Sequence, residues 1–559
     1  MKLVIGIGYP VAHDSNIAVV NESGKILFAA SEERFSRIKK DGKMPVECFS
    51  EIKPMLENNE IFAAIPYYRL DKIFQERYCT KSPGKFKKTS PFWLMSKAPN
   101  YILDPLYYGY RLIKSFMPPK EHKNFFGHEV GFYAGHHDSH AASAYYTSGF
   151  KKSVIMTYDG GITCEAWLGT IQEGINGEVK RKVLGSRWDR KWKAAWMYSG
   201  ITNYLGFKPN HHEGKITGLA AFGKHNEKCI EIVGKLLKDR TFSFYYGKRI
   251  RSQLDAALGK FSREDIAYAA QRIAEENVVM HLENYMKNFS SENICLAGGL
   301  FANVRINQKV KELGFKNIFI HPAMGDDGCG LGSALLYLGK ERGLKPFKLQ
   351  DVYFGTEYDS YFIKKELKRH GVAFQHIKNI EYHLAELLAK EKVIGRFNGR
   401  MEYGPRALGN RSILYQATDI AVNDWLNKNL KRTEFMPFAP VTLAEYAKKC
   451  YKNLKGAEYA AKFMTITFDC TQWMKESCPA VVHVDNTARP QLIDMSTNPS
   501  YYKILDEYRK ITGIPSIINT SFNMHEEPIV CSPDDAIRSF KHGKLDYLAI
   551  GDFLVSRSQ

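Results

Sequence analysis

Two histidines in the string GHHDSHAASAYY have the spacing of a metal-binding pair. His136 and His140 lie four residues apart at the start of an alanine-rich run that favours helix, so both imidazoles would share one helical face. Imidazole is a common ligand of divalent transition metals. Asp159 and Asp326 follow apolar runs that read as strands, and their carboxylates could complete the site. The pattern predicts a metal site suited to iron, zinc or manganese; the alternative is a polar surface.

Glycine-rich turns could hold a phosphate through main-chain amides. Gly298 and Gly299 follow an apolar strand in LAGGLFANVRIN and precede a helical stretch, where the helix dipole favours anions. The string GDDGCGLGSALLYLG repeats this pattern, and its small residues would let a flat ring approach. Two such turns predict a nucleotide held by the main chain. We reject GLAAFGK (218–224) as a P-loop because His225 follows it and no strand precedes it.

Arginines are most concentrated in the string NGRMEYGPRALGNRS. Arg400, Arg406 and Arg411 lie there among three glycines and a proline. Guanidinium groups on such a loop suit two-pronged binding of phosphate or carboxylate oxygens. Further polar groups that could join them are Arg432, Arg489 and the string PSIINTSFN. Together they predict a pocket that stabilises charge on phosphoryl or acyl-phosphate oxygens, with the metal site polarising a carbonyl or a hydroxyl.

Strands that alternate with helices must position these residues. Apolar strands such as LVIGIG, NIAVV and KSVIMTY are followed by turns and helical stretches, which indicates an α/β fold. A connection at about 345–360 separates a first domain (1–350) from a second (365–559). An aromatic, basic segment at about 61–130 reads as an inserted helical cap that also covers the acceptor.

Composition restricts the classes of protein further. The 559 residues are 44% hydrophobic and 25% charged, which is ordinary for a globular protein. No apolar run has the roughly 20 residues that a membrane-spanning helix needs, and the scattered cysteines suit a reducing cytoplasm. We therefore expect a cytoplasmic protein without membrane association. The 79 basic and 60 acidic residues give a charge of +19; phosphate-rich substrates or nucleic acid are possible partners, and solubility is the alternative.

The motifs resemble those of the O-carbamoyltransferase family of nodulation-factor, cephalosporin and tobramycin biosynthesis. The resemblance spans nearly the whole chain, and the matching strings include HDSNIAVV (13–20), EERFSRIKKDGKMP (32–45), HHDSHAASAYY (136–146), LAGGLFANVRIN (296–307), GDDGCGLGSAL (325–335), GRMEYGPRALGNRSIL (399–414) and NTSFNMHEEPIVCSPDDAI (519–537). It implies an actin/sugar-kinase-like (ASKHA) first domain, similar to the threonylcarbamoyl-transfer domain of tRNA modification, followed by a YrdC-like α/β domain.

The resemblance also implies roles for individual residues. His136, His140 and Asp326 would bind the metal, with Asp159 as a less certain fourth ligand; we expect Fe²⁺, with Zn²⁺ or Mn²⁺ as alternatives. The expected catalytic residues are His13 near the acceptor and, facing carbamoyl phosphate and ATP, Arg406, Arg411, Arg432 and Ser521. The expected cofactor-binding residues are Lys215, Gly298, Gly299, Asn303, Arg400, Asn519 and Asn523. One departure is GGIT after Asp159, where related sequences often carry an acidic residue that Glu165 could replace.

The expected activity is ATP-dependent O-carbamoylation. Carbamoyl phosphate and ATP, with Mg²⁺, would give carbamoyl adenylate, and the carbamoyl group would then pass to a hydroxyl of a sugar, an antibiotic, a nucleotide or a modified base. Two alternatives remain: a nucleic-acid-binding protein, and an actin-like ATPase or kinase without carbamoyl chemistry. The arginine loop argues against the second, because that fold alone needs no second anion site. We expect a monomer or a homodimer.

Overall fold

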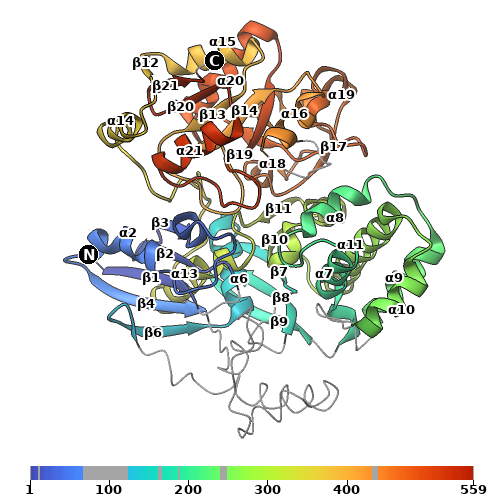
Figure 1. Ribbon diagram of the computed structural model, residues 1–559. Coiled ribbons are helices and arrows are strands. Elements are labelled where there is room, and N and C mark those ends of the chain that lie inside the picture. The colour runs from blue at the N-terminus through green and yellow to red at the C-terminus, as the bar shows by residue number, and fades with distance from the viewer. Residues whose placement is uncertain are drawn as a thin grey trace, which may run out of the picture.

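The computed structural model describes residues 2–9, 13–66, 124–160, 167–186, 189–238, 248–430 and 438–557. Within these ranges the chain forms two α/β domains, one stacked on the other (Figure 1). The first contains two mixed sheets with helices between and beside them. The second is built on one large mixed sheet. The α/β prediction is confirmed.

The first sheet has the order β3-β2-β1-β4-β6-β5. Its strands are β1 (Lys2–Gly8), β2 (Asn16–Asn21), β3 (Ile26–Ser31), β4 (Glu60–Pro66), β5 (Asn124–Phe125) and β6 (His128–Ala134). β1, β2 and β3 are antiparallel neighbours, whereas β4 is parallel to both β1 and β6. The ends of the predicted insertion at 61–130 are thus strands of the sheet, and its central part, 67–123, lies outside the described residues.

The second sheet repeats this topology. Its order is β11-β10-β7-β8-β9, formed by β7 (Lys152–Tyr158), β8 (Trp167–Ile175), β9 (Glu178–Ser186), β10 (Asn293–Ala297) and β11 (Asn317–Ile320). Again three antiparallel strands are followed by two parallel ones. Apart from the short edge strand β5, the two sheets have the same order of successive strands and the same strand directions. This duplication is the architecture of the actin/sugar-kinase fold.

Two helices lie between the sheets and pack against each other. α6 (His136–Ser148) contacts β7 and β10, and α13 (Cys329–Arg342) contacts β1 and β4. The contact is close at Gly332 of α13, where an added Cβ would lie 1.9 Å from the main-chain oxygen of Ser139. The small residues of α13 therefore accommodate α6 and β1, and not the flat ring that their composition suggested.

Further helices flank the second sheet. α11 (Arg263–Met286) contacts α7 (Ala194–Tyr204), α8 (Glu213–Ala220), α9 (Glu227–Lys238) and α12 (Val304–Glu312), and α10 (Lys248–Leu258) contacts α9. Two other helices, α1 (Glu33–Ser36) and α2 (Val46–Leu56), adjoin β3. No helix in the described ranges has the length and apolar character that crossing a membrane requires.

The second domain has an eight-stranded sheet of order β12-β21-β20-β13-β14-β19-β15-β18. These strands are β12 (Gln375–His376), β13 (Ile394–Phe397), β14 (Arg411–Gln416), β15 (Ala439–Leu443), β18 (Gln491–Ile493), β19 (Ser516–Ser521), β20 (Tyr547–Ile550) and β21 (Phe553–Ser556). α15 (Ile380–Ala389) packs on α20 (Pro499–Thr512), and α21 (Pro533–Gly543) packs on α14 (Ser360–Arg369). The predicted likeness to YrdC stays a prediction.

Shorter elements complete the second domain: α16 (Val422–Asn429), α17 (Ala447–Cys450), α18 (Glu458–Ala461), α19 (Gln472–Ser477), β16 (Phe468–Asp469) and β17 (Thr487–Ala488). Because α14 packs on α21, residues 360–369 belong with this domain, which extends slightly before the expected position 365.

Reciprocal hydrogen bonds join the two domains. From the first domain, Arg34 Nη2 donates to the carbonyl of Gly404 at 2.6 Å, and Arg37 donates to the carbonyls of Pro528 and Ile529, each at 2.7 Å. From the second, Arg400 Nη2 donates to the carbonyl of Leu27 at 2.7 Å. These bonds hold the arginine loop and residues 528–529 against the first domain.

Candidate active site

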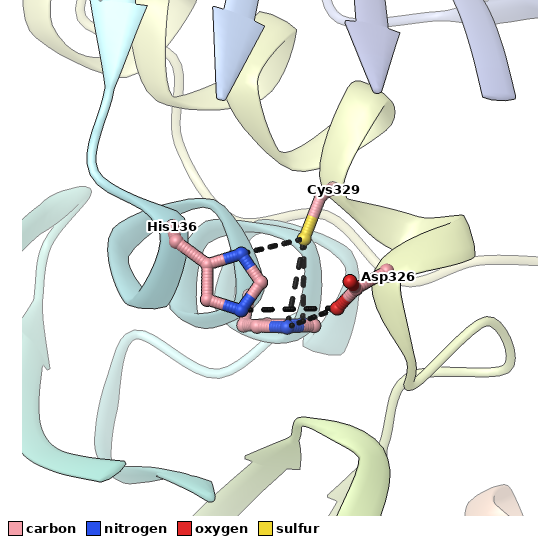
Figure 2. A group of neighbouring side chains, drawn as sticks. His136, Asp326 and Cys329 are labelled. Carbon is pink, nitrogen blue, oxygen red and sulfur yellow. Dashed lines mark hydrogen bonds and ion pairs between the residues drawn. The ribbon is translucent and has the colours of Figure 1, made fainter. Parts of the chain in front are cut away.

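The two predicted metal-binding histidines lie together in the interior. His136 is the first residue of α6 and His140 lies one turn later, and both side chains are fully buried. Asp159 directly follows β7, and Asp326 opens the 3-10 turn that leads into α13. The four residues therefore come from α6, the end of β7 and the turn before α13, and α6 and α13 pack against each other. Figure 2 shows His136 and Asp326 of this cluster facing one another.

Both carboxylates face the Nε2 atoms of both histidines. Asp159 Oδ2 lies 3.1 Å from His136 Nε2 and 3.6 Å from His140 Nε2. Asp326 Oδ1 lies 3.7 Å and 3.4 Å from the same two atoms. Ligand atoms about 2.0–2.2 Å from one tetrahedral ion are separated by roughly 3.4 Å. These separations fit a single transition-metal ion.

Electrostatics at this cluster favour a cation. Burial alone would lower the pKa of His136, but Asp326 and Asp159 outweigh it and raise that pKa to about 10. Burial would likewise raise the pKa of Asp159, yet its hydrogen bonds to His136 and His140 hold that pKa well below its usual range. The two carboxylates thus stabilise positive charge between them, as a metal site must.

Cys329 is a fifth member of this cluster that the sequence analysis missed. Its Sγ lies 3.6 Å from both ring nitrogens of His140 and 4.0 Å from Nδ1 of His136. Burial would raise the pKa of the Cys329 thiol, but the two histidines lower it overall. The available signal was its spacing: it follows Asp326 by three residues, about one helical turn.

A cavity of about 380 Å³ opens beside the cluster and is bordered by both domains. Among the residues predicted to act, it is lined by His13, Asp159, Gly299, Asn303 and Asp326 from the first domain and by Arg406, Ser521 and Asn523 from the second. The structure therefore places eight of the sixteen predicted residues on the wall of one chamber, and His136 and His140 lie behind that wall. Gly298, Lys215 and Asn519 do not border it.

Arg406 borders the chamber, and no carboxylate of the described residues forms an ion pair with it. Its Nε is buried and has no hydrogen-bond partner among the described residues. Burial lowers its pKa to about 10, partly offset by Asp327. Arg489 is near enough to repel it electrostatically, and burial together with Arg406 lowers the pKa of Arg489 well below its usual range. The buried guanidinium of Arg406 on the wall of the cavity favours an anionic ligand.

Arg400 and Arg411 are held by main-chain carbonyls, and their predicted contact with substrate stays a prediction. Arg411 is fully buried; its Nη1 and Nη2 donate to main-chain carbonyls, among them those of Asn398 and Gly399, and its guanidinium lies 3.6 Å from the ring centre of Phe397. Arg400 donates to the carbonyl of Leu27 in the first domain and to those of Phe354 and Gly355 in the connection. Neither borders the chamber, because both guanidinium groups are engaged by the main chain.

Other predicted residues also support the main chain. Asn519 Nδ2 donates to Gln491 Oε1 at 2.7 Å and to the carbonyl of Ala407 at 3.2 Å, which replaces its predicted nucleotide contact. Gly298 has φ of +105°, and its amide donates to the carbonyl of Met324 at 2.6 Å, so it shapes the turn that presents Gly299. Lys215 is buried in α8. Arg432 and Glu165 lie outside the described residues.

His13 belongs to a charged group on the wall of the chamber. Its Nδ1 lies 2.8 Å from Asp14 Oδ2, and Lys40 Nζ lies 3.5 Å from the same oxygen. Burial would lower the pKa of His13, but Asp14 raises it overall. Asn303, on another part of the wall, caps α12 and accepts from the amides of Arg305 and Ile306, each at 3.2 Å. Its amide nitrogen donates to Gln271.

The fold and the chamber define an actin/sugar-kinase-like domain that shares one cavity with a second α/β domain. A family model described as "Carbamoyltransferase N-terminus" matches residues 3–335, and one described as "Carbamoyltransferase C-terminus" matches residues 385–557. The chain therefore belongs to the carbamoyltransferase family and is a carbamoyltransferase enzyme. Both matches together argue against the kinase-only alternative.

Several relatives align along most of the chain. An uncharacterized protein of Methanocaldococcus jannaschii is 30% identical over an alignment of 632 positions, which covers 100% of both chains. Nodulation protein NolNO of Sinorhizobium fredii is 31% identical over 98% of this chain and 79% of its own. Nodulation protein U of the same species is 29% identical over 70% of this chain and 72% of its own.

Among solved structures, the chain is similar to HypF of T. kodakarensis, with a TM-score of 0.31 and 14% identity over 62% of this chain and 48% of that one. It is also similar to component A of the (R)-2-hydroxyglutaryl-CoA dehydratase of Acidaminococcus fermentans, with a TM-score of 0.33 and 12% identity over 61% of this chain and 100% of that one.

Proposed function

We propose that this carbamoyltransferase is an ATP-dependent O-carbamoyltransferase that makes and consumes carbamoyl adenylate in one chamber. The observation that carries the proposal is the shared cavity of about 380 Å³, in which Arg406 and Ser521 of the second domain and Asp326 and Asn303 of the first face the same space. An intermediate formed at the arginine side would reach the histidine cluster without entering bulk water, which protects a reactive mixed anhydride.

The chemistry divides into three balanced steps. Water displaces phosphate from carbamoyl phosphate and leaves carbamate. A carbamate oxygen then attacks the α-phosphorus of ATP and expels pyrophosphate, which gives carbamoyl adenylate. Finally the acceptor hydroxyl attacks the carbamoyl carbon and AMP leaves. The net products are the O-carbamoylated acceptor, phosphate, pyrophosphate and AMP.

The residues of the chamber have distinct tasks in this scheme. Arg406 would hold the phosphate oxygens of carbamoyl phosphate, and Ser521 and Asn523 would orient the reactants beside it. Asn303 and the amide of Gly299 would border the nucleotide. His13, held by Asp14, would accept the proton of the acceptor hydroxyl.

The histidine cluster fits a divalent metal in donor type, burial and spacing. Such an ion, when bound by His136, His140 and Asp326, would supply Lewis acidity toward a carbonyl or hydroxyl oxygen. We propose Fe²⁺ as the ion of this cluster, with Zn²⁺ or Mn²⁺ as alternatives, and Mg²⁺ as the ion that accompanies ATP. The acceptor is a hydroxylated sugar, antibiotic, nucleotide or modified base, and a cytoplasmic location is part of the same proposal.

The test is product analysis of the full chain with ATP, carbamoyl phosphate and a panel of hydroxylated acceptors. The expected result is AMP and pyrophosphate in equal amounts, dependent on carbamoyl phosphate, with a carbamoylated acceptor detected by mass spectrometry. Release of ADP alone, or turnover that ignores carbamoyl phosphate, would contradict the proposal. As a control, Arg509→Ala removes a surface ion pair of the second domain and should leave the products unchanged.

A further inference from the structure

We infer that Cys329 supplies a sulfur ligand to the metal centre, so that nitrogen, oxygen and sulfur donors all bind the ion. The inference rests on the proposed function only for the presence of a metal. It does not depend on the identity of the carbamoyl donor or of the hydroxyl acceptor. It concerns a residue outside the predicted ligand set, on the opposite helix from the two histidines.

The separations between donor atoms carry the inference. His136, His140, Asp326 and Cys329 each offer one ligand atom, and these atoms all lie within 4.8 Å of one another. Two ligands of one tetrahedral ion are separated by about 3.4 Å when both are nitrogen or oxygen and by about 3.6 Å when one is sulfur, given bonds of roughly 2.1 and 2.3 Å. His140 Nε2 lies 3.4 Å from Asp326 Oδ1. Cys329 Sγ lies 3.6 Å from both ring nitrogens of His140, so the sulfur faces that ring and reaches the Nε2 side by rotation of either side chain.

The scaffold explains how these donors converge. Asp326 and Cys329 are three residues apart at the start of α13, and the two histidines are four apart at the start of α6. α6 thus contributes two donors from one face, and the other pair comes from the 3-10 turn at Asp326 and the first residue of α13, Cys329. In Figure 2 the sulfur of Cys329 and the carboxylate of Asp326 point toward the ring of His136. The close approach of α13 to α6 at Gly332 fixes the distance between the two pairs.

The surroundings of Cys329 differ from those of a buried structural cysteine. Cys295, inside β10, provides the comparison: it is equally buried, and its Sγ contacts the hydroxyl of Ser153. Cys329 Sγ instead contacts two imidazoles beside a carboxylate, all fully or nearly buried. Asp159 also remains within reach of both Nε2 atoms and is compatible with sulfur ligation as a further ligand.

A thiolate in the ligand set changes which ions the site retains. Sulfur is a soft donor, so it favours Zn²⁺ and Fe²⁺ over Mg²⁺ and Mn²⁺, which prefer oxygen. Because the thiol must lose its proton on binding, loading with metal releases an additional proton. The inference thus narrows the set of ions that the histidines and carboxylates alone leave open.

Cobalt substitution of the full chain tests the inference directly. A thiolate bound to Co²⁺ gives an intense near-ultraviolet charge-transfer band that histidine and carboxylate ligands do not give. We expect this band in the native chain with one Co²⁺ bound, its loss in both Cys329→Ser and Cys329→Ala, and at least about tenfold weaker Co²⁺ binding in both variants.

Controls separate ligation from folding and from the catalytic proposal. Cys295→Ala removes an equally buried thiol of the same domain and should keep the band. In Cys329→Ser, retention of the visible d–d bands of Co²⁺ is the control that the variant folds and binds the ion. A native chain that binds Co²⁺ without the charge-transfer band, or fails to bind Co²⁺ at this cluster, would overturn the inference. Formation of AMP from carbamoyl phosphate and ATP is measured separately, so failure of the proposed function is distinguishable.

Discussion

Glu402 is the buried anchor of the arginine loop, and its charge can be removed with little change in shape. Its Oε1 accepts from the amides of Leu408 at 2.8 Å, Asn410 at 2.7 Å and Arg411 at 3.0 Å, and the side chain is only 2% exposed. Glu402→Gln keeps an oxygen acceptor but removes its negative charge. We expect the loop to open locally much more often in this variant.

The size of the effect on loop opening follows from the three hydrogen bonds that Glu402 accepts. A hydrogen bond to a charged group contributes about 1.5–3 kcal/mol and a neutral one about 0.5–1.5 kcal/mol, so each of the three amides loses about 1 kcal/mol. The total of about 3 kcal/mol corresponds to roughly 100-fold faster opening, at about 1.4 kcal/mol per factor of ten. The new amide nitrogen adds a further cost, because Oε2 has no partner among the described residues.

Hydrogen exchange of these three amides, followed by mass spectrometry of peptides covering 398–412, measures the effect. We expect roughly 100-fold faster exchange there. We also expect a matching loss of carbamoyl-phosphate-dependent AMP formation, because Arg406 lies in the same loop, between Glu402 and the anchored amide of Leu408. Glu445→Gln is the matched control: that exposed glutamate accepts one hydrogen bond from Tyr502. Unchanged exchange at the three amides in Glu402→Gln would refute the reasoning.

Three further predictions follow from single contacts. Arg406→Ala should abolish adenylate formation, whereas His140→Ala should spare it and block delivery to the acceptor; loss of the same step in both variants, by pyrophosphate exchange and product analysis, would contradict the division between the domains. Gly298→Ala should lower the thermal midpoint clearly more than Gly314→Ala, because both have positive φ but only at Gly298 would a Cβ lie 2.4 Å from a main-chain oxygen. Glu526→Gln should lower the free energy of unfolding by at most about 1 kcal/mol at neutral pH, because Glu526 Oε1 lies 2.8 Å from His212 Nε2. Burial would raise the pKa of Glu526, but the contact with His212 lowers it overall. In denaturant titrations, the difference from the native chain should therefore be present above about pH 4.5 and vanish as the pH falls.

The architecture and the histidine pair were predictable because they depend on local pattern. Apolar strands followed by glycine turns identify the β-strands, and a four-residue spacing places His136 and His140 on one face wherever the helix lies. The positions of Asp159 and Asp326 depend on pairing between distant strands. Asp159 reaches the cluster from the end of β7, and Asp326 reaches it from the turn before α13.

The roles of the arginines were not predictable in the same way. Arg400, Arg406 and Arg411 look equivalent in the sequence, since each lies among glycines in one loop. In the structure only Arg406 borders the chamber; the other two satisfy main-chain carbonyls. Which of them meets a carbonyl depends on how the loop packs against the first domain. Cys329 was missed because its only signal, the three-residue spacing from Asp326, becomes informative once Asp326 is placed beside the histidines.

The seam between α6 and α13 has a mechanical consequence. Because the donors come from α6, the end of β7 and the start of α13, a bound ion would link segments that pack on both sheets of the first domain. Any opening of the two halves would stretch bonds to the ion, so loss of metal should loosen the whole first domain and with it the wall that the second domain needs.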